Sequence, residues 1–128
     1  MMTYLDTSVA LAHLLGENRH PDDVLWQQRL VSSRLLEYEL WVRINARGLA
    51  RTHGDATRDV LRVVALVEMA PLVLARAIEP FPTSVRTLDA LHLASMLYLR
   101  DQGEDVTVAT YDDRLAAGAR ALGFTVAA

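Results

Sequence analysis

The sequence contains no cysteine and no lysine, so all 13 of its Lys and Arg residues are arginine. The lack of cysteine excludes disulfide bonds, thiolate nucleophiles and zinc sites with cysteine ligands. The lack of lysine excludes the phosphate-binding lysine of nucleotide-binding loops, Schiff-base chemistry and a lysine general base. These absences remove several common classes of nucleophile, base and phosphate ligand.

Targeting and membrane signals are also missing. Residues 1–6 lack the basic and apolar regions of a secretion signal, and no uncharged apolar segment reaches the length of a membrane span. We therefore expect a cytoplasmic protein. The 128 residues, 52% of them hydrophobic, predict one domain over residues 1–128 with a sizeable core. The net charge of -3 argues against binding of polyanions by bulk charge but leaves room for local basic patches.

Short apolar segments alternate with helical patterns along the chain. Strands are expected at residues 2–5, 30–33, 106–110 and 124–126, and residues 66–69 fit either a strand or a last helical turn. Helices are expected at residues 9–15, 21–26, 35–49, 55–69, 72–78, 85–101 and 112–122. Strands separated by helices predict a parallel sheet covered by helices, an α/β sandwich.

Residues 87–94 combine an ionisable side chain with the pattern of a buried helix. Leu88, Leu91 and Leu97 recur at helical spacing, so most of this segment should face a core. Asp89 lies within it, and a buried carboxylate is unfavourable unless a cation or hydrogen-bond donors meet it. Arg86 is the one arginine within three positions. Another part of the chain is therefore expected to compensate Asp89.

Three further acids occupy comparable positions. Asp6 and Asp112 each follow a predicted strand and begin a helix, and Glu39 borders the apolar side of helix 35–49. Ligand sites of parallel sheets collect outside the carboxyl ends of the strands, so Asp6 and Asp112 converge if their strands are neighbours. Carboxylates gathered without cations repel one another, and protons or hard ions such as Mg²⁺ or Mn²⁺ resolve the conflict. The pattern predicts an acidic metal site suited to phosphodiester hydrolysis.

Each acid also has a local interpretation. Asp6 and Asp112 are suitable N-caps for the helices that follow them. Glu39 is spaced to pair with Arg43 one turn later, and Asp89 is placed to bond within the first turn of its helix. One shared metal site accounts for all four positions better than four separate coincidences.

Four segments resemble the four motifs of PIN-domain ribonucleases. They are residues 4–8, 33–39, 88–94 and 108–115. Their order and the length of the chain resemble the VapC-type toxins of bacterial toxin–antitoxin pairs. The likeness extends over essentially the whole chain, and the third segment is its most specific part.

This resemblance implies a PIN-like three-layer α/β/α sandwich with four to five short parallel strands and a pocket that holds Mg²⁺ or Mn²⁺. The catalytic and metal-binding acids that match the family motifs are Asp6, Glu39, Asp89 and Asp112. The polar residues expected beside them, at the substrate, are Thr7, Ser8 and Thr110. Glu37 competes with Glu39, although two residues apart on a helix they point to different sides. Asp113 competes with Asp112, which is favoured because it follows the strand more directly.

The resemblance also implies an RNA substrate, a homodimer and inhibition by a cognate VapB-type antitoxin whose C-terminal segment covers the site. We therefore expect a metal-dependent endoribonuclease toxin. The alternative is a non-catalytic, dimeric interaction module with the PIN fold. Loss of one of the four acids would favour that alternative, and all four are present.

Arginines recur every four residues at Arg43, Arg47 and Arg51, which predicts one stripe beside Glu39. Such a stripe is either a solvated helix face or a surface for RNA phosphates or for an acidic antitoxin segment. In the second interpretation Arg43 and Arg47 bind substrate. His92, three residues after Asp89, fits a packed helix histidine better than a site residue.

Overall fold

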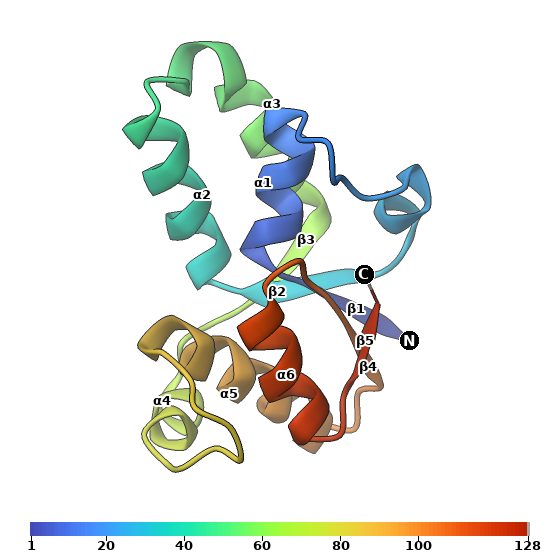
Figure 1. Cartoon of the computed structure of the whole chain (residues 1–128), viewed down its shortest axis with the longest axis vertical. Helices are drawn as coiled ribbons and strands as arrows, with labels where there is room; N and C mark the ends of the chain where they lie inside the picture. The colour runs from blue at the N-terminus through green and yellow to red at the C-terminus, as the bar shows by residue number, and fades with distance from the viewer. Residues whose placement is uncertain (128) are drawn as a thin grey trace.

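The computed structural model describes residues 1–127, in which a five-stranded parallel sheet lies between two layers of helices (Figure 1). The strands are β1 (Met2–Leu5), β2 (Leu30–Ser33), β3 (Val64–Val67), β4 (Val106–Ala109) and β5 (Thr125–Ala127). One face carries α1 (Thr7–Leu15), α2 (Leu35–Ala46) and α3 (Ala50–Val63). The other carries α4 (Pro71–Ala77), α5 (Thr87–Asp101) and α6 (Asp113–Ala121). The expected α/β/α sandwich is confirmed.

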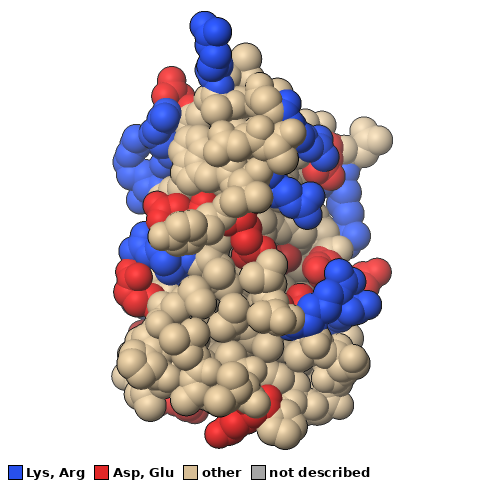
Figure 2. Space-filling model, turned by 90° about the vertical axis from the view of Figure 1, so that its left-hand side faces the viewer, with Lys and Arg blue, Asp and Glu red and all other residues tan. Residues whose placement is uncertain are grey.

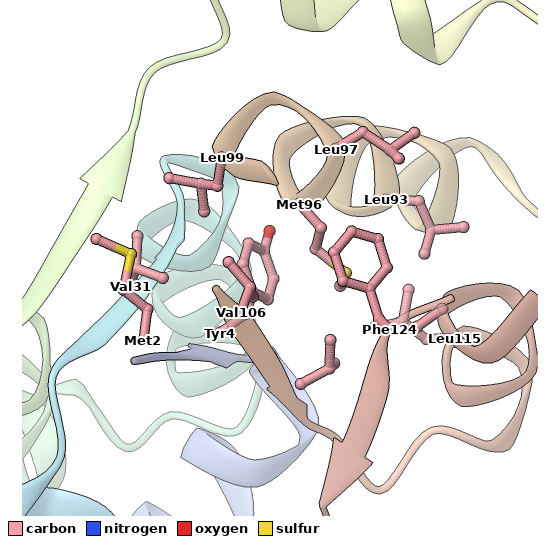
Figure 3. Packing of buried hydrophobic residues seen from close by; sticks show 12 residues of the cluster. Met2, Tyr4, Val31, Leu93, Met96, Leu97, Leu99, Val106, Leu115 and Phe124 are labelled. Carbon is pink, nitrogen blue, oxygen red and sulfur yellow. The ribbon is translucent and has the colours of Figure 1, made fainter. Parts of the chain in front are cut away.

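The strands are apolar on both sides because both faces of the sheet are covered. Successive side chains of a strand point to opposite faces. Tyr4 and Val31 pack into the cluster formed with α5 and α6, where Met96 reaches down from α5 (Figure 3). Leu5 and Leu30 belong to the second cluster, on the side of α1, α2 and α3. The sheet is therefore anchored to helices on each side.

The strand order is β3-β2-β1-β4-β5, so the first strand lies in the middle of the sheet. The chain adds β2 and β3 on one side of β1 and then crosses over to place β4 on the other side. At such a reversal the connections after the two central strands diverge and leave a crevice outside their carboxyl ends. The register pairs Leu5 with Ala109, which brings the residues after β1 and β4 together.

The structure corrects the prediction between residues 35 and 69. The predicted helix 35–49 ends earlier, at Ala46, and Gly48 follows with a positive φ of 67°, a conformation that glycine adopts readily. The next helix begins at Ala50 instead of residue 55. It stops at Val63, because residues 64–67 pair with β2 as a strand. Their apolar run fits both states, and the sheet decides between them.

Two smaller differences concern short segments. The helix predicted over residues 21–26 is only a 3₁₀ segment, η1 (Asp23–Gln27), where Leu25 alone is buried. Such short 3₁₀ pieces are common as connectors. The last strand lies one residue later than predicted. Within residues 1–127, no helix has both the length and the apolar character that crossing a membrane requires.

The helix α6 lies close against α5 at Gly118. A Cβ atom at this position would be 2.9 Å from Cδ1 of Leu93, a distance that side chains do not tolerate without a shift. Glycine therefore allows the two helices to approach. This contact packs α6 against the helix that carries Asp89 and His92.

Candidate active site

Asp6 lies at the carboxyl end of β1 and is buried, with 5% of its surface exposed. Its Oδ2 accepts hydrogen bonds from Ser8 Oγ at 2.5 Å, from Thr110 Oγ1 at 2.7 Å and from the Ser8 backbone N–H at 3.4 Å. The last of these caps α1. The local capping role and the place in the pocket are therefore compatible, because the cap uses only one carboxylate oxygen.

Asp112 stands beside Asp6 because β1 and β4 are neighbours in the sheet. The two are linked by Thr110, whose hydroxyl donates to Asp6 and accepts from the Asp112 backbone N–H at 3.0 Å. Asp112 itself is exposed and caps α6, since its Oδ1 accepts from the N–H groups of Arg114 at 2.9 Å and Leu115 at 3.0 Å. The expected convergence of the acids after these strands is present.

Glu39 projects from α2 toward the same region, and its side chain is 22% exposed. Its Oε1 accepts hydrogen bonds from Thr7 Oγ1 at 3.1 Å and from His92 Nε2 at 2.6 Å. The spacing of Glu39 and Arg43 also allows a salt bridge between them, but the salt bridges formed within residues 1–127 do not include this pair. Glu39 is thus held by residues of α1 and α5 and not by its own helix.

His92 was missed as a site residue by the sequence analysis. It is buried, with 2% exposed, but it also lines the pocket, where it lies between Glu39 and the Tyr4 hydroxyl, 2.7 Å from its Nδ1. Burial by itself lowers the pKa of His92, yet the bonded Glu39 carboxylate, with Asp6 and Asp89 nearby, raises that pKa overall. Burial also raises the pKa of Tyr4, which stays a neutral phenol.

The contact with Glu39 assigns one hydrogen of the His92 ring. A carboxylate only accepts, so His92 Nε2 carries the proton that binds Glu39. The Tyr4 hydroxyl donates to Nδ1 when the ring is neutral and accepts from the Nδ1 proton when the ring is protonated. The sequence contained only a weak indication of these roles. His92 follows Asp89 by three positions. Tyr4 precedes Asp6 by two positions, and its side chain lies on the opposite face of β1 from that of Leu5.

Asp89 lies in the first turn of α5 and is half-buried. Its Oδ2 accepts from the Arg86 backbone N–H at 3.2 Å, the local bond considered from the sequence. The expectation that its surroundings are mostly buried is wrong for the first turn, because Leu88 is 48% exposed. Most side chains of the helix are buried between Ala90 and Leu99.

All four acids line one hollow of about 660 Å³ outside the carboxyl ends of β1 and β4. Thr7, Ser8 and Arg43 also line it, as expected of substrate-binding residues. On the face that carries α2 and α4, acidic side chains gather across the middle, bordered by arginines (Figure 2). The lining of this hollow includes Glu39 and Asp112 and does not include their competitors Glu37 and Asp113.

Two expected substrate residues lie elsewhere. Thr110 is buried behind Asp6, where its hydroxyl holds the carboxylate. Arg47 lines a neighbouring hollow. The predicted arginine stripe is wrong, since Arg47 follows the end of α2 and Arg51 belongs to α3.

The donor set suits a hard divalent cation. In each of the four carboxylates one oxygen accepts all the hydrogen bonds that residues 1–127 provide, and the other oxygen accepts none. Oxygen ligands of this kind are those that Mg²⁺ and Mn²⁺ prefer. Within the same residues, however, no three His, Asp or Glu side chains are grouped closely enough to hold one ion together. The donors therefore fit an ion that takes one or two carboxylates and keeps much of its water, as Mg²⁺ commonly does.

Comparison with known proteins places the chain in a family. The model of the PIN domain family matches residues 3–121, a span that contains all four acids. "Ribonuclease VapC47" from Mycobacterium tuberculosis (strain CDC 1551 / Oshkosh) is 29% identical over 133 residues, covering 98% of this chain and 96% of that protein. The fold, the order of the motifs and these two matches agree. This chain therefore belongs to the PIN-domain family, and it is similar over nearly its whole length to a ribonuclease of the VapC type.

Proposed function

We propose that this chain is a Mg²⁺- or Mn²⁺-dependent endoribonuclease toxin that a cognate VapB-type antitoxin holds inactive. One observation carries the proposal: four acids from separate parts of the chain line a single hollow, and in each one carboxylate oxygen accepts no hydrogen bond from residues 1–127. The similarity to a protein named as a ribonuclease supports RNA as the substrate.

The residues of the hollow have different roles in the proposed reaction. Asp6 and Asp112 would hold the ion with their second carboxylate oxygens, and Asp89 would contribute through water. When bound, the ion supplies activation of water and neutralisation of charge on the leaving oxygen. Glu39 orients the attacking water, because His92 and Thr7 fix its other oxygen. Arg43, on the wall of the hollow, meets the phosphate.

Exposed apolar side chains beside the acids support the proposed binding of an antitoxin. Tyr38 is 62% exposed, Val42 is 64% exposed, and both line the hollow together with Leu88. Exposed apolar groups around a polar centre are typical of surfaces that another polypeptide covers. For the homodimer we propose an interface at α4, because its apolar side chains are exposed. Leu72 is 72% exposed, and Ile78, directly after the helix, is 88% exposed.

A cleavage assay tests the proposed activity. Single-stranded and structured RNAs are incubated with the chain in Mg²⁺, in Mn²⁺ and in chelator. We expect endonucleolytic products with either metal, none in chelator, and none from Asp6→Asn or Asp89→Asn. Asp105→Asn is the matched control, because Asp105 is exposed and lies outside the lining of the hollow. Full activity in chelator would contradict the metal mechanism.

The non-catalytic interaction module is favoured by one observation, the absence within residues 1–127 of three grouped ligands. Calorimetric titration with Mn²⁺ distinguishes the two functions without relying on activity. An enzyme binds Mn²⁺ at one saturable site, and Asp6→Asn weakens that binding. An interaction module shows neither Mn²⁺ binding nor cleavage in a folded protein.

A further inference from the structure

A second hollow of about 230 Å³ adjoins the acidic one. The two share Ser8, Leu11 and Arg43 in their linings, so they lie next to each other. Arg19 and Arg47 line the second hollow only. A ligand seated over the acids therefore has a path into this neighbouring space.

The second hollow has the opposite charge to the first. Three arginines, Arg19, Arg43 and Arg47, line it, and Glu17 is the one acid among its lining residues. None of these arginines takes part in the salt bridges formed within residues 1–127. Guanidinium groups without carboxylate partners match the geometry of phosphate oxygens, which they bind in pairs. The hollow therefore offers charge to an anion that the acidic site next to it cannot attract.

The second hollow also has an aromatic side chain in its wall. Tyr111 lines the second hollow, and its backbone N–H donates to Ser8 Oγ at 2.9 Å, the same hydroxyl that binds Asp6. The backbone that carries the ring is thus tied, through Ser8, to Asp6. The guanidinium of Arg19 lies 4.4 Å from the centre of the ring. Aromatic rings and guanidinium planes are the groups on which proteins stack the bases of single-stranded RNA.

We propose that this second hollow is a nucleotide subsite for single-stranded RNA. Arg47 binds the phosphate adjacent to the scissile one, and the stacked pair of Tyr111 and Arg19 carries the neighbouring base. The inference rests on the proposed function, because it takes RNA as the ligand of the acidic hollow. Since the net charge of the chain is -3, a local basic surface of this kind is what retains the polyanion.

Binding without cleavage provides the test. A fluorescently labelled single-stranded RNA of twelve nucleotides is titrated with the chain in chelator, at several salt concentrations, and followed by anisotropy. Tyr111→Leu should weaken binding about tenfold, as the loss of one stacked base does, while Tyr111→Phe retains the ring and the affinity. Arg47→Ala should make the slope of log K against log salt less negative by about 0.7, the value for one phosphate contact in a single strand.

Two controls show whether these changes are specific to the second hollow and to single-stranded RNA. Arg120→Ala removes an exposed arginine of α6 that lines neither hollow, and it should change neither affinity nor slope. A duplex RNA of the same length should bind with no difference between Tyr111→Leu and Tyr111→Phe, since paired bases cannot reach the ring. Melting temperatures of all variants exclude unfolding as the cause.

The outcomes separate the subsite from the enzyme. Single-strand affinity unchanged by both Tyr111→Leu and Arg47→Ala overturns the subsite, even if the chain cleaves RNA. The subsite is also overturned if these variants weaken only the binding of an acidic peptide, because the hollow would then serve a protein. Failure of cleavage with every RNA and metal contradicts the proposed function, whereas the predicted losses of RNA binding would still support the subsite.

Discussion

The four acids of the site form two pairs that the protein holds in different ways. The inner pair, Asp6 and Glu39, accepts hydrogen bonds from side chains distant in the sequence, Thr110 for Asp6 and His92 for Glu39. The rim pair, Asp89 and Asp112, accepts from backbone N–H groups at the start of its own helices. Inner acids depend on the completed fold, and rim acids depend on a helix start.

This difference separates two kinds of stability. A hydrogen bond within the packed interior leaves an unpaired group when one partner is removed, and that group stays poorly hydrated. A cap at a wet helix end loses less, because water replaces the missing acceptor. Changes at the inner pair should therefore affect folding and activity together, whereas changes at the rim pair should allow the two to be separated.

The largest effect is expected at Asp6. Asp6→Ala and Asp6→Asn should each lower the cleavage rate about a thousandfold, because both remove the charge at the centre of the site. Asp6→Ala should also lower the free energy of unfolding by about 1–3 kcal/mol, since Ser8 and Thr110 lose their acceptor. Asp6→Asn keeps an acceptor oxygen and should unfold nearly as the unmodified chain does. Cleavage kinetics and urea unfolding measure the two quantities. An active Asp6→Asn protein would show that Asp6 is not a residue of the active site.

His92 should produce the next largest effect. His92→Ala leaves the Tyr4 hydroxyl without its partner and Glu39 with Thr7 alone, so cleavage should fall about 10–100-fold, as for other groups that orient a ligand. His92→Gln can still donate to Glu39 and should recover part of the rate. The comparison uses the turnover number at saturating RNA and the free energy of unfolding. If cleavage follows stability alone in the two variants, His92 is a packing residue and does not position Glu39.

Asp112 tests whether cap and charge can be separated. Asp112→Asn keeps the cap of α6, because asparagine caps about as well as aspartate, and it should leave the melting temperature almost unchanged. Asp112→Ala should lower the free energy of unfolding by about 1 kcal/mol. Both should reduce Mn²⁺ affinity and cleavage alike. An Asp112→Asn protein with full activity would show that this residue is a cap only.

The smallest stability change is expected at Asp89. In the metal-free protein, Asp89→Asn relieves repulsion among the acids but loses the favourable interaction of a negative charge with the helix start, about 0.3–1 kcal/mol. These effects oppose each other, and the amide oxygen still accepts from Arg86. The melting temperature without metal should therefore rise only slightly, although cleavage is lost. A clear drop, measured by calorimetry in chelator, would mean that Asp89 is mainly a structural cap.

Much of the fold followed from local patterns in the sequence. Strands β1, β2 and β4 and the helix starts at Asp6 and Asp112 lie where the pattern of apolar residues and capping side chains predicts. The prediction failed between residues 46 and 67, where Gly48 ends α2 early and the apolar run of β3 fits helix and strand alike. Residues 64–67 form a strand because they pair with β2.

The sequence by itself determined the parallel sheet, the acids at strand and helix ends, and the resemblance to PIN domains, because each of these depends on residues close together in the chain. The tertiary structure alone decided that His92 lies between Tyr4 and Glu39 and that Thr110 holds Asp6. These contacts join residues 53 to 104 positions apart, and the spacing of a sequence carries no record of them. The same holds for the basic hollow, where α1, α2 and the loop after β4 meet only once the sheet has formed.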